Sequence, residues 1–295
     1  MNRRREDAIV KRLRAAVRPG HAVAGIGDDC AAVEAPRGQL LLLKTDCVVE
    51  RRHFQPTAPA ASVGWKAACR AVSDIAACGG EPREALVTCV VRASQTGRWL
   101  AALYRGIEKA GREFGFHVVG GELARTGGPA VINVAMTGAV TRREFLRRGG
   151  GRPGDALFVT GVLGGSLSSG WHLKFRPRLA EARWLAESIR PTAMMDLSDG
   201  LASDLPRLAA ASGTGFILDR EAVPRRRGVS ARAALTDGED FELLFAVPPA
   251  RAARLARDWA RRFPALPLTR IGTLAERGVA RGLGRAGGYD HFNGA

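Results

Sequence analysis

Residues 62–80 read SVGWKAACRAVSDIAACGG, and the fold assignment depends on this stretch more than on any other. Its apolar residues recur at helical spacing, which predicts an alanine-rich helix over Ser62–Cys78. Gly79, Gly80 and Pro82 end that helix, because glycine and proline do not continue it. A strand-like stretch, Ala85–Val91, follows at once. The region therefore predicts a helix that passes directly into a strand.

The same mixture of helices and strands continues in both directions. Further helices are expected at residues 3–17, 99–114, 178–188, 201–211 and 250–262. Strands are expected near residues 22–33, 39–44, 116–119, 131–140, 156–160 and 241–247, with a turn at Gly120-Gly121. The glycine-rich, charged segment RRGGGRPGD, residues 147–155, has the composition of a linker. We therefore predict an α+β fold with two domains, residues 1–146 and 147–295.

Composition narrows the classes of function. The 45 basic and 29 acidic residues leave a net charge of +16, but the arginines are spread along the chain and only two tyrosines are present. A specific nucleic-acid partner is therefore not expected. The longest aliphatic run, Leu40–Leu43, is too short to cross a membrane, and the basic N-terminus is followed by no apolar segment. These features predict a cytoplasmic protein without a membrane partner.

Acidic residues repeatedly follow apolar stretches, beside glycine, serine or threonine. The members of this pattern are Asp28 and Asp29, Asp46, Asp74, Glu122, Asp196 and Asp199, and Asp237, Glu239 and Asp240. Strand ends meet along one rim of a sheet, so such carboxylates can converge, and converging carboxylates repel unless a cation joins them. Magnesium prefers oxygen ligands and commonly bridges carboxylates to nucleotide phosphates. Each acid by itself also suits a helix cap or a turn, but the repeated pattern favours a metal site.

Familiar nucleotide and hydrolase motifs are missing. The chain has no GxxxxGK[ST] sequence, no protein-kinase motif set, no HExxH and no GxSxG. Its five cysteines are odd in number and show no CxxC spacing, so neither a disulfide framework nor a zinc site is expected. An enzyme that uses nucleotides with this sequence would need a phosphate site built from acids and metal ions.

Several motifs occur in an order that resembles the thiamine-monophosphate kinase family. They are GIGDDCAAV, LLKTD, ERRHF, KAACRAVSDIAACGGEP, VVGGE, MMDLSDGLASDL, DGEDFELLF and the terminal YDHF. The resemblance spans nearly the whole chain. That family belongs to a superfamily with aminoimidazole ribonucleotide synthetase and selenophosphate synthetase. The resemblance implies ATP-dependent phosphorylation of thiamine monophosphate to thiamine diphosphate with several magnesium ions. It also implies a homodimer in which the N-terminal α/β domains share a β-barrel, and a C-terminal α/β sandwich domain.

The resemblance also assigns roles to individual residues. The implied magnesium ligands are Asp29, Thr45, Asp46, Asp74, Glu122, Asp196 and Asp199. The implied ATP contacts are Tyr104, Gly121, Glu122, Arg148 and Ser198, and the implied contacts to thiamine monophosphate are His53 and Glu239. No general base is expected, because the attacking phosphate oxygen is already ionised at neutral pH and the reaction needs charge neutralisation and alignment.

The chain departs from the family pattern at a few positions. Lys44 stands where a small hydroxyl residue is usual, Glu122 replaces an aspartate, and Arg51 and Arg52 replace a glycine and an apolar residue. An aromatic residue near the C-terminus is replaced around Ala286. Two alternatives therefore stay open: a paralogue acting on another phosphorylated substrate, in the manner of aminoimidazole ribonucleotide synthetase, and a non-catalytic, arginine-rich protein that binds a ligand or nucleic acid.

Overall fold

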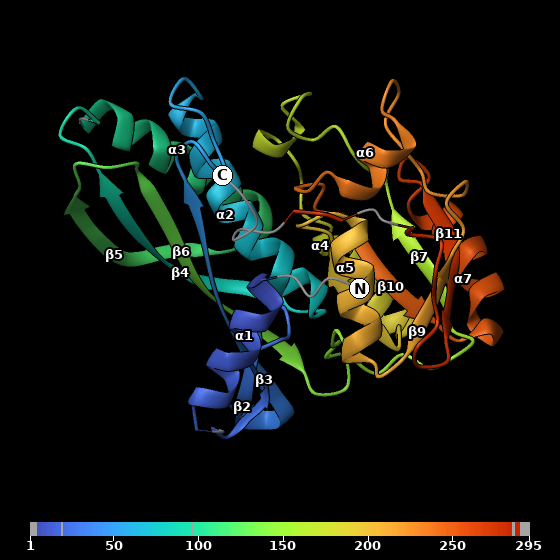
Figure 1. Ribbon diagram of the computed structural model, residues 1–295. Coiled ribbons are helices and arrows are strands. Elements are labelled where there is room, and N and C mark those ends of the chain that lie inside the picture. The colour runs from blue at the N-terminus through green and yellow to red at the C-terminus, as the bar shows by residue number, and fades with distance from the viewer. Residues whose placement is uncertain (1–4, 19, 96, 285–286, 290–295) are drawn as a thin grey trace.

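The computed structural model describes residues 5–18, 20–95, 97–284 and 287–289. In these residues the chain forms two six-stranded sheets, each made by one half of the sequence, with helices packed against them (Figure 1). Both sheets are mixed, since each contains one parallel strand pair among antiparallel ones. The prediction of a two-domain α/β architecture is thus confirmed at that level.

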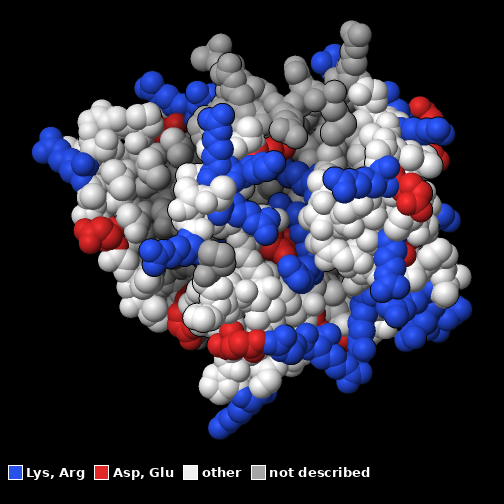
Figure 2. All heavy atoms as spheres, turned by 60° about the horizontal axis from the view of Figure 1, so that its bottom comes forward, with Lys and Arg blue, Asp and Glu red and all other residues white. Residues whose placement is uncertain are grey.

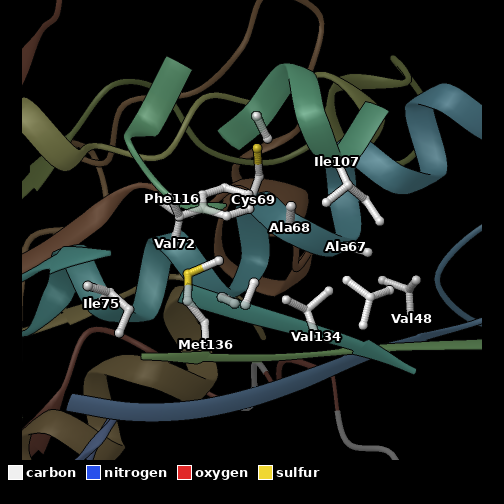
Figure 3. Close-up of a cluster of buried hydrophobic side chains, with 14 of the residues drawn as sticks. Val48, Ala67, Ala68, Cys69, Val72, Ile75, Ile107, Phe116, Val134 and Met136 are labelled. Carbon is white, nitrogen blue, oxygen red and sulfur yellow. The ribbon is translucent and has the colours of Figure 1, made fainter. Parts of the chain in front are cut away.

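The first sheet has the strand order β1-β2-β3-β6-β4-β5. Its strands are β1 (Ala22–Ala24), β2 (Ala31–Ala35), β3 (Gln39–Val49), β4 (Glu81–Val91), β5 (His117–Arg125) and β6 (Val131–Thr141), and the helices of this half are α1 (Arg5–Ala16), α2 (Ala60–Ala77) and α3 (Gly97–Phe114). Helices α2 and α3 cover one face, where alternate residues of β3, β4 and β6 are buried. Figure 3 shows part of this core, in which Val134 and Met136 of β6 lie below Ala68 and Val72 of α2.

The second sheet has the order β12-β9-β11-β7-β10-β8. Its strands are β7 (Ala156–Thr160), β8 (Ala193–Asp196), β9 (Gly215–Leu218), β10 (Leu243–Val247), β11 (Leu268–Ala275) and β12 (Ala280–Arg281), and its helices are α4 (Leu179–Trp184), extended by a π-helical turn at Leu185–Ile189, α5 (Leu201–Ala211), α6 (Ala231–Thr236) and α7 (Pro249–Arg262). Leu205 and Leu208 of α5 pack on one face of this sheet, whereas Leu255 and Trp259 of α7 pack on the other. Among the described residues, no helix is long and apolar enough to span a membrane.

Helix α2 joins the two halves. Its residue Ala76 belongs to a core cluster formed mainly by the second half, together with Phe158 and Phe245. In the opposite direction, Phe175 and Phe241 of the second half pack into the core of the first half, with their ring centroids 3.9 Å apart. Side chains on α2 are therefore placed where the two halves meet.

Two sequence predictions need correction. Gly120-Gly121 is not a turn, because β5 runs through both residues and pairs with β4 across a register shift. A Cβ atom at Gly121 would lie 1.9 Å from the carbonyl oxygen of Val87, so glycine permits this close approach. The apolar run 39–44 also continues to Val49, which places Thr45 and Asp46 inside β3 and not after its end. The sheet is open in the described residues of one chain, and the barrel expected between two chains stays a prediction.

Helices α2 and α3 cross at two glycines, which gives a stability prediction. A Cβ atom at Gly106 would lie 1.9 Å from the carbonyl oxygen of Ala61, and one at Gly64 would lie 2.0 Å from that of Leu103. We expect Gly106→Ala to lower the free energy of unfolding by about 1–3 kcal/mol, because backbone atoms cannot yield as a flexible side chain does. Urea unfolding checks this value. The control is Gly97→Ala in the same helix, where no atom lies within 4 Å of the added methyl group; equal effects of the two substitutions would contradict the packing argument.

Candidate active site

Three predicted metal ligands converge where the two halves meet. Asp29 follows β1, Asp74 lies on α2 and Asp196 ends β8, and one oxygen from each carboxylate lies within 4.8 Å of the others. All three residues are buried. The Oδ2 atom of Asp29 is buried without a hydrogen-bond partner, and Asp196 accepts a 2.6 Å hydrogen bond from the Ser73 hydroxyl. The arrangement offers an all-oxygen donor set with one unused buried oxygen, which is the set that suits Mg²⁺.

Basic side chains surround these acids. Arg148 donates a 2.5 Å hydrogen bond to Oδ1 of Asp29, and the Lys44 ammonium lies 2.9 Å from Oδ2 of Asp74. Arg70 contacts the predicted ligand Asp46 through two nitrogens, at 2.9 and 3.0 Å. The carboxylates are thus only partly neutralised by the protein's own cations.

The crowding of buried carboxylates changes their acidity. Burial, reinforced by the nearby charge of Asp29, raises the pKa of Asp196 to about 7. Burial also raises the pKa of Asp74 well above its ordinary value, although the Lys44 charge opposes the shift. The pKa of Lys44 rises above its ordinary value because the charges of Asp74 and Asp46 outweigh its burial. Negative charge at this place therefore requires a cation nearby.

The two predicted substrate contacts meet at a second cluster, centred on Lys66 of α2. Lys66 is fully buried, and its ammonium donates to the carbonyl oxygen of His53 and to Oε2 of Glu239. It also lies 2.9 Å from Nδ1 of His172. The His53 ring also accepts a 2.9 Å hydrogen bond at Nδ1 from the backbone of Val49.

Arg70 connects this second cluster with the acids. Its NH1 nitrogen lies 3.0 Å from Oε1 of Glu239, and its other two side-chain nitrogens contact Oδ1 of Asp46. Burial would raise the pKa of Glu239, but the hydrogen bond from His172 and the charges of Lys66 and Arg70 lower it to about 2. Glu239 also has a φ angle of 64°, which is uncommon for a residue with a side chain and is typical of functional sites.

Asp199 and Ser198 lie in the loop between β8 and α5. Arg207 of α5 contacts Oδ2 of Asp199, and it lies 3.1 Å from Oδ1 of Asp204. The carbonyl oxygen of Ser198 accepts a 2.7 Å hydrogen bond from the backbone of Glu239. This loop therefore brings two predicted residues beside the Glu239 turn.

The structure does not bring all predicted residues together. Thr45 is exposed and hydrogen-bonds Asn133 at 3.0 Å, on the face of the sheet opposite to Asp46, because adjacent strand residues point to opposite faces. Glu122 pairs in register with Thr88, which itself pairs with Asn133, so Glu122 shares the face of Thr45. Their roles as metal ligands stay predictions.

Two further predicted ATP residues lie away from the acids. Tyr104 of α3 is half-buried beside Cys89 of β4, and Gly121 lies on the edge strand β5. Arg51 and Arg52 are exposed in the turn after β3, whereas Ala286 lies outside the described residues.

The sequence analysis missed Lys66, Arg70 and His172. A signal for the first two was available, because Lys66, Arg70 and Asp74 follow one another at intervals of four residues and therefore share one face of α2. His172 carries no such signal, since only the packing of the two halves places it beside Lys66.

The comparisons with known proteins agree over most of the chain. The model of the AIR synthase related protein N-terminal domain matches residues 27–140, and that of the corresponding C-terminal domain matches residues 152–283. Thiamine-monophosphate kinase of Rhodopirellula baltica is 36% identical over 92% of this chain and 90% of its own length. The same-named protein of Salmonella typhimurium is 33% identical over 91% of each chain.

A solved structure described as AaThiL complexed with AMPPCP and TMP superposes with a TM-score of 0.78 at 30% identity, covering 94% of this chain and 91% of that chain. Family models, relatives and fold thus agree on one family. The chain belongs to the thiamine-monophosphate kinase family of AIR synthase related proteins.

Proposed function

We propose that this chain transfers the γ-phosphoryl group of ATP to thiamine monophosphate, forming thiamine diphosphate and ADP. The observation that carries the proposal is Arg70, which contacts a predicted metal ligand, Asp46, and a predicted substrate contact, Glu239, at the same time. The predicted metal site and the predicted site for thiamine monophosphate are therefore contiguous. The names of the relatives, and the ATP analogue and TMP of the solved structure, support the same reaction.

We infer that the buried acids hold magnesium. Asp29, Asp74 and Asp196 would form its centre, with Asp46 and Asp199 beside them, and the unpartnered Oδ2 of Asp29 supports this assignment. Bound magnesium would neutralise the charge of the ATP phosphates and of the transferred group. A cation at this place would also offset the burial and the nearby charge of Asp29, which together raise the pKa of Asp196.

The chain's own residues supply charge and alignment. Arg148 and Lys44 place positive charge beside the acids, while His53 and Glu239 would orient the thiamine monophosphate. In the transfer, the monophosphate oxygen forms a bond to the γ-phosphorus as the bond between that phosphorus and the β,γ-bridging oxygen breaks. The attacking oxygen is already ionised, so no side chain has to remove a proton. Basic side chains outnumber acidic ones on the face shown in Figure 2, which favours the approach of anionic substrates.

The direct test is product formation by the purified chain with ATP, Mg²⁺ and thiamine monophosphate. We expect thiamine diphosphate to accumulate, and addition of EDTA to stop it. Absence of product together with Mg²⁺-dependent ATP binding would contradict the assignment of thiamine monophosphate as the acceptor and favour another phosphorylated acceptor. Absence of both product and ATP binding would contradict the kinase assignment. Salt-sensitive retention of DNA would then favour the non-catalytic alternative.

We also propose that the chain forms a homodimer through the first sheet, whose uncovered face would meet that of a second copy. Strand β5 is an edge strand of nine residues, and unpaired edges of this length invite pairing with another chain. The large apolar residues exposed on the uncovered face of this sheet include Leu43 and Leu86, with exposed fractions of 41% and 49%. A shared barrel formed by two such sheets would cover them. In this proposal, residues 1–146 form the domain that mainly binds metal and dimerises, and residues 147–295 form the α/β sandwich domain.

The dimer proposal gives a measurable expectation. Leu86 faces away from α2 and α3 and is 49% exposed, so Leu86→Arg would place a charge in the shared face and is expected to shift the chain from dimer to monomer. Sedimentation velocity measures the change. Ile217→Arg is the matched control, because Ile217 is 42% exposed on the second sheet. A wild-type monomer, or an unchanged mass of the Leu86 variant, would refute the interface.

A further inference from the structure

Lys44 lies among the acids in a place where a metal ion would be expected. It stands two residues before Asp46 on β3, so both side chains point to the covered face of the sheet. Its ammonium lies 2.9 Å from Oδ2 of Asp74 and 3.9 Å from Oδ2 of Asp46. The Lys44 side chain is 19% exposed, so solvent screens these contacts only weakly. Lys44 thus joins two carboxylates as a bridging cation does.

The remaining acids are arranged differently. Asp29 keeps a buried Oδ2 atom without a partner, and the hydrogen bond that Asp196 receives from Ser73 brings no positive charge. Oxygens of Asp29, Asp74 and Asp196 lie within 4.8 Å of one another. This part of the cluster can still accept a divalent ion, whereas the space between Asp46 and Asp74 already contains a positive charge.

An ammonium and a divalent ion do not share the same carboxylate oxygen easily. Two like charges about 4 Å apart repel strongly, because the effective dielectric constant of a protein is far below that of water. A divalent ion that bridges Asp46 and Asp74 would have to displace Lys44. The displaced ammonium would then lose both of its carboxylate partners.

We propose that the Lys44 ammonium takes the place of one divalent ion between Asp46 and Asp74. The nucleotide complex of this chain therefore contains one metal ion fewer than the same chain with a neutral oxygen donor at position 44. The inference rests on the proposed function only in using an ATP analogue as the ligand. It makes Lys44 a residue that sets the metal content of the site.

The experiment counts bound Mn²⁺ in the presence of AMPPCP, with free Mn²⁺ measured by electron paramagnetic resonance. Lys44→Thr removes the charge and supplies a hydroxyl oxygen, and we expect it to bind one more Mn²⁺ per chain than the wild type. Lys44→Arg keeps the charge and is expected to leave the number unchanged. In the double variant Lys44→Thr, Asp46→Asn, the additional ion should be lost. Circular dichroism and thermal unfolding establish that each variant is folded.

Equal Mn²⁺ numbers in folded wild type and Lys44→Thr would overturn the inference, as would a gain of one ion in Lys44→Arg. Thiamine diphosphate formation is assayed separately on the wild type. A wild type that binds Mn²⁺ and AMPPCP but makes no thiamine diphosphate would refute the proposed reaction. The Mn²⁺ count would still decide whether Lys44 replaces an ion.

Discussion

Asp74→Asn is expected to reduce the rate of thiamine diphosphate formation by about 10³-fold, the scale on which electrostatic groups that stabilise phosphoryl transfer act. Asp74 shares its place with Asp29 and Asp196, so the loss of its charge weakens the centre of the cluster. Asparagine has nearly the same shape. The substitution also removes a carboxylate whose charged form is disfavoured by burial, as its raised pKa indicates. We therefore expect the fold to be kept, with a melting temperature close to that of the wild type.

The assay is turnover under saturating ATP, Mg²⁺ and thiamine monophosphate, with thermal unfolding measured on the same samples. Asp258→Asn is the control, because Asp258 lies on α7 and contacts Arg254 and Arg261 at the surface. Its activity should be that of the wild type. An Asp74→Asn variant with near wild-type turnover would exclude the buried acids as the metal centre.

Lys66→Met is expected to raise KM for thiamine monophosphate by about 10-fold or more, since a lost hydrogen bond to a charged group costs about 1.5–3 kcal/mol. Lys66 contacts Glu239 and His172 and the backbone of His53, so it acts as a positioning residue for both predicted substrate contacts. KM for ATP should change little. Lys174→Met provides the matched control, because Lys174 is exposed on the same half of the chain as His172.

The pH dependence separates positioning from a merely structural role. Burial lowers the pKa of Lys66 to about 8, although the charge of Glu239 opposes the shift. The ammonium is therefore present below this pH and is lost as the pH rises through it. The groups facing Lys66 are Glu239, His172, Arg70 and Asp46.

We accordingly expect KM for thiamine monophosphate to rise above about pH 8 in the wild type. Lys66→Arg should remove this rise, because a guanidinium stays charged throughout the range. A wild-type KM that is constant across this range, or identical pH profiles of wild type and Lys66→Arg, would contradict the role of Lys66. A variant that melts early but keeps its KM would show a structural role alone.

Local residue patterns were sufficient for most of the secondary structure and for the main acidic residues. The helices near α2, α3 and α5 follow from apolar spacing and from glycine or proline at their ends, because these signals act within a few residues. The motifs around Asp29, Asp74 and Asp196 also predict a metal site without the fold, since oxygen donors next to glycine and serine suit a phosphate-binding enzyme. The Gly120-Gly121 pair indicates a turn that is not formed, because glycine also permits close strand pairing.

Only the tertiary structure decided which residues meet. Asp46 and Thr45 are neighbours in the sequence, yet the alternation of β3 sends them to opposite faces of the sheet. Lys66 and Glu239 are separated by 173 positions and become partners because α2 packs between the two halves. The sequence alone determined the chemistry of the acids. The packing of two sheets around one helix decided which acids are joined by Lys44 and Arg70. Such contacts join residues far apart in the sequence, so they depend on long-range packing and not on local propensity.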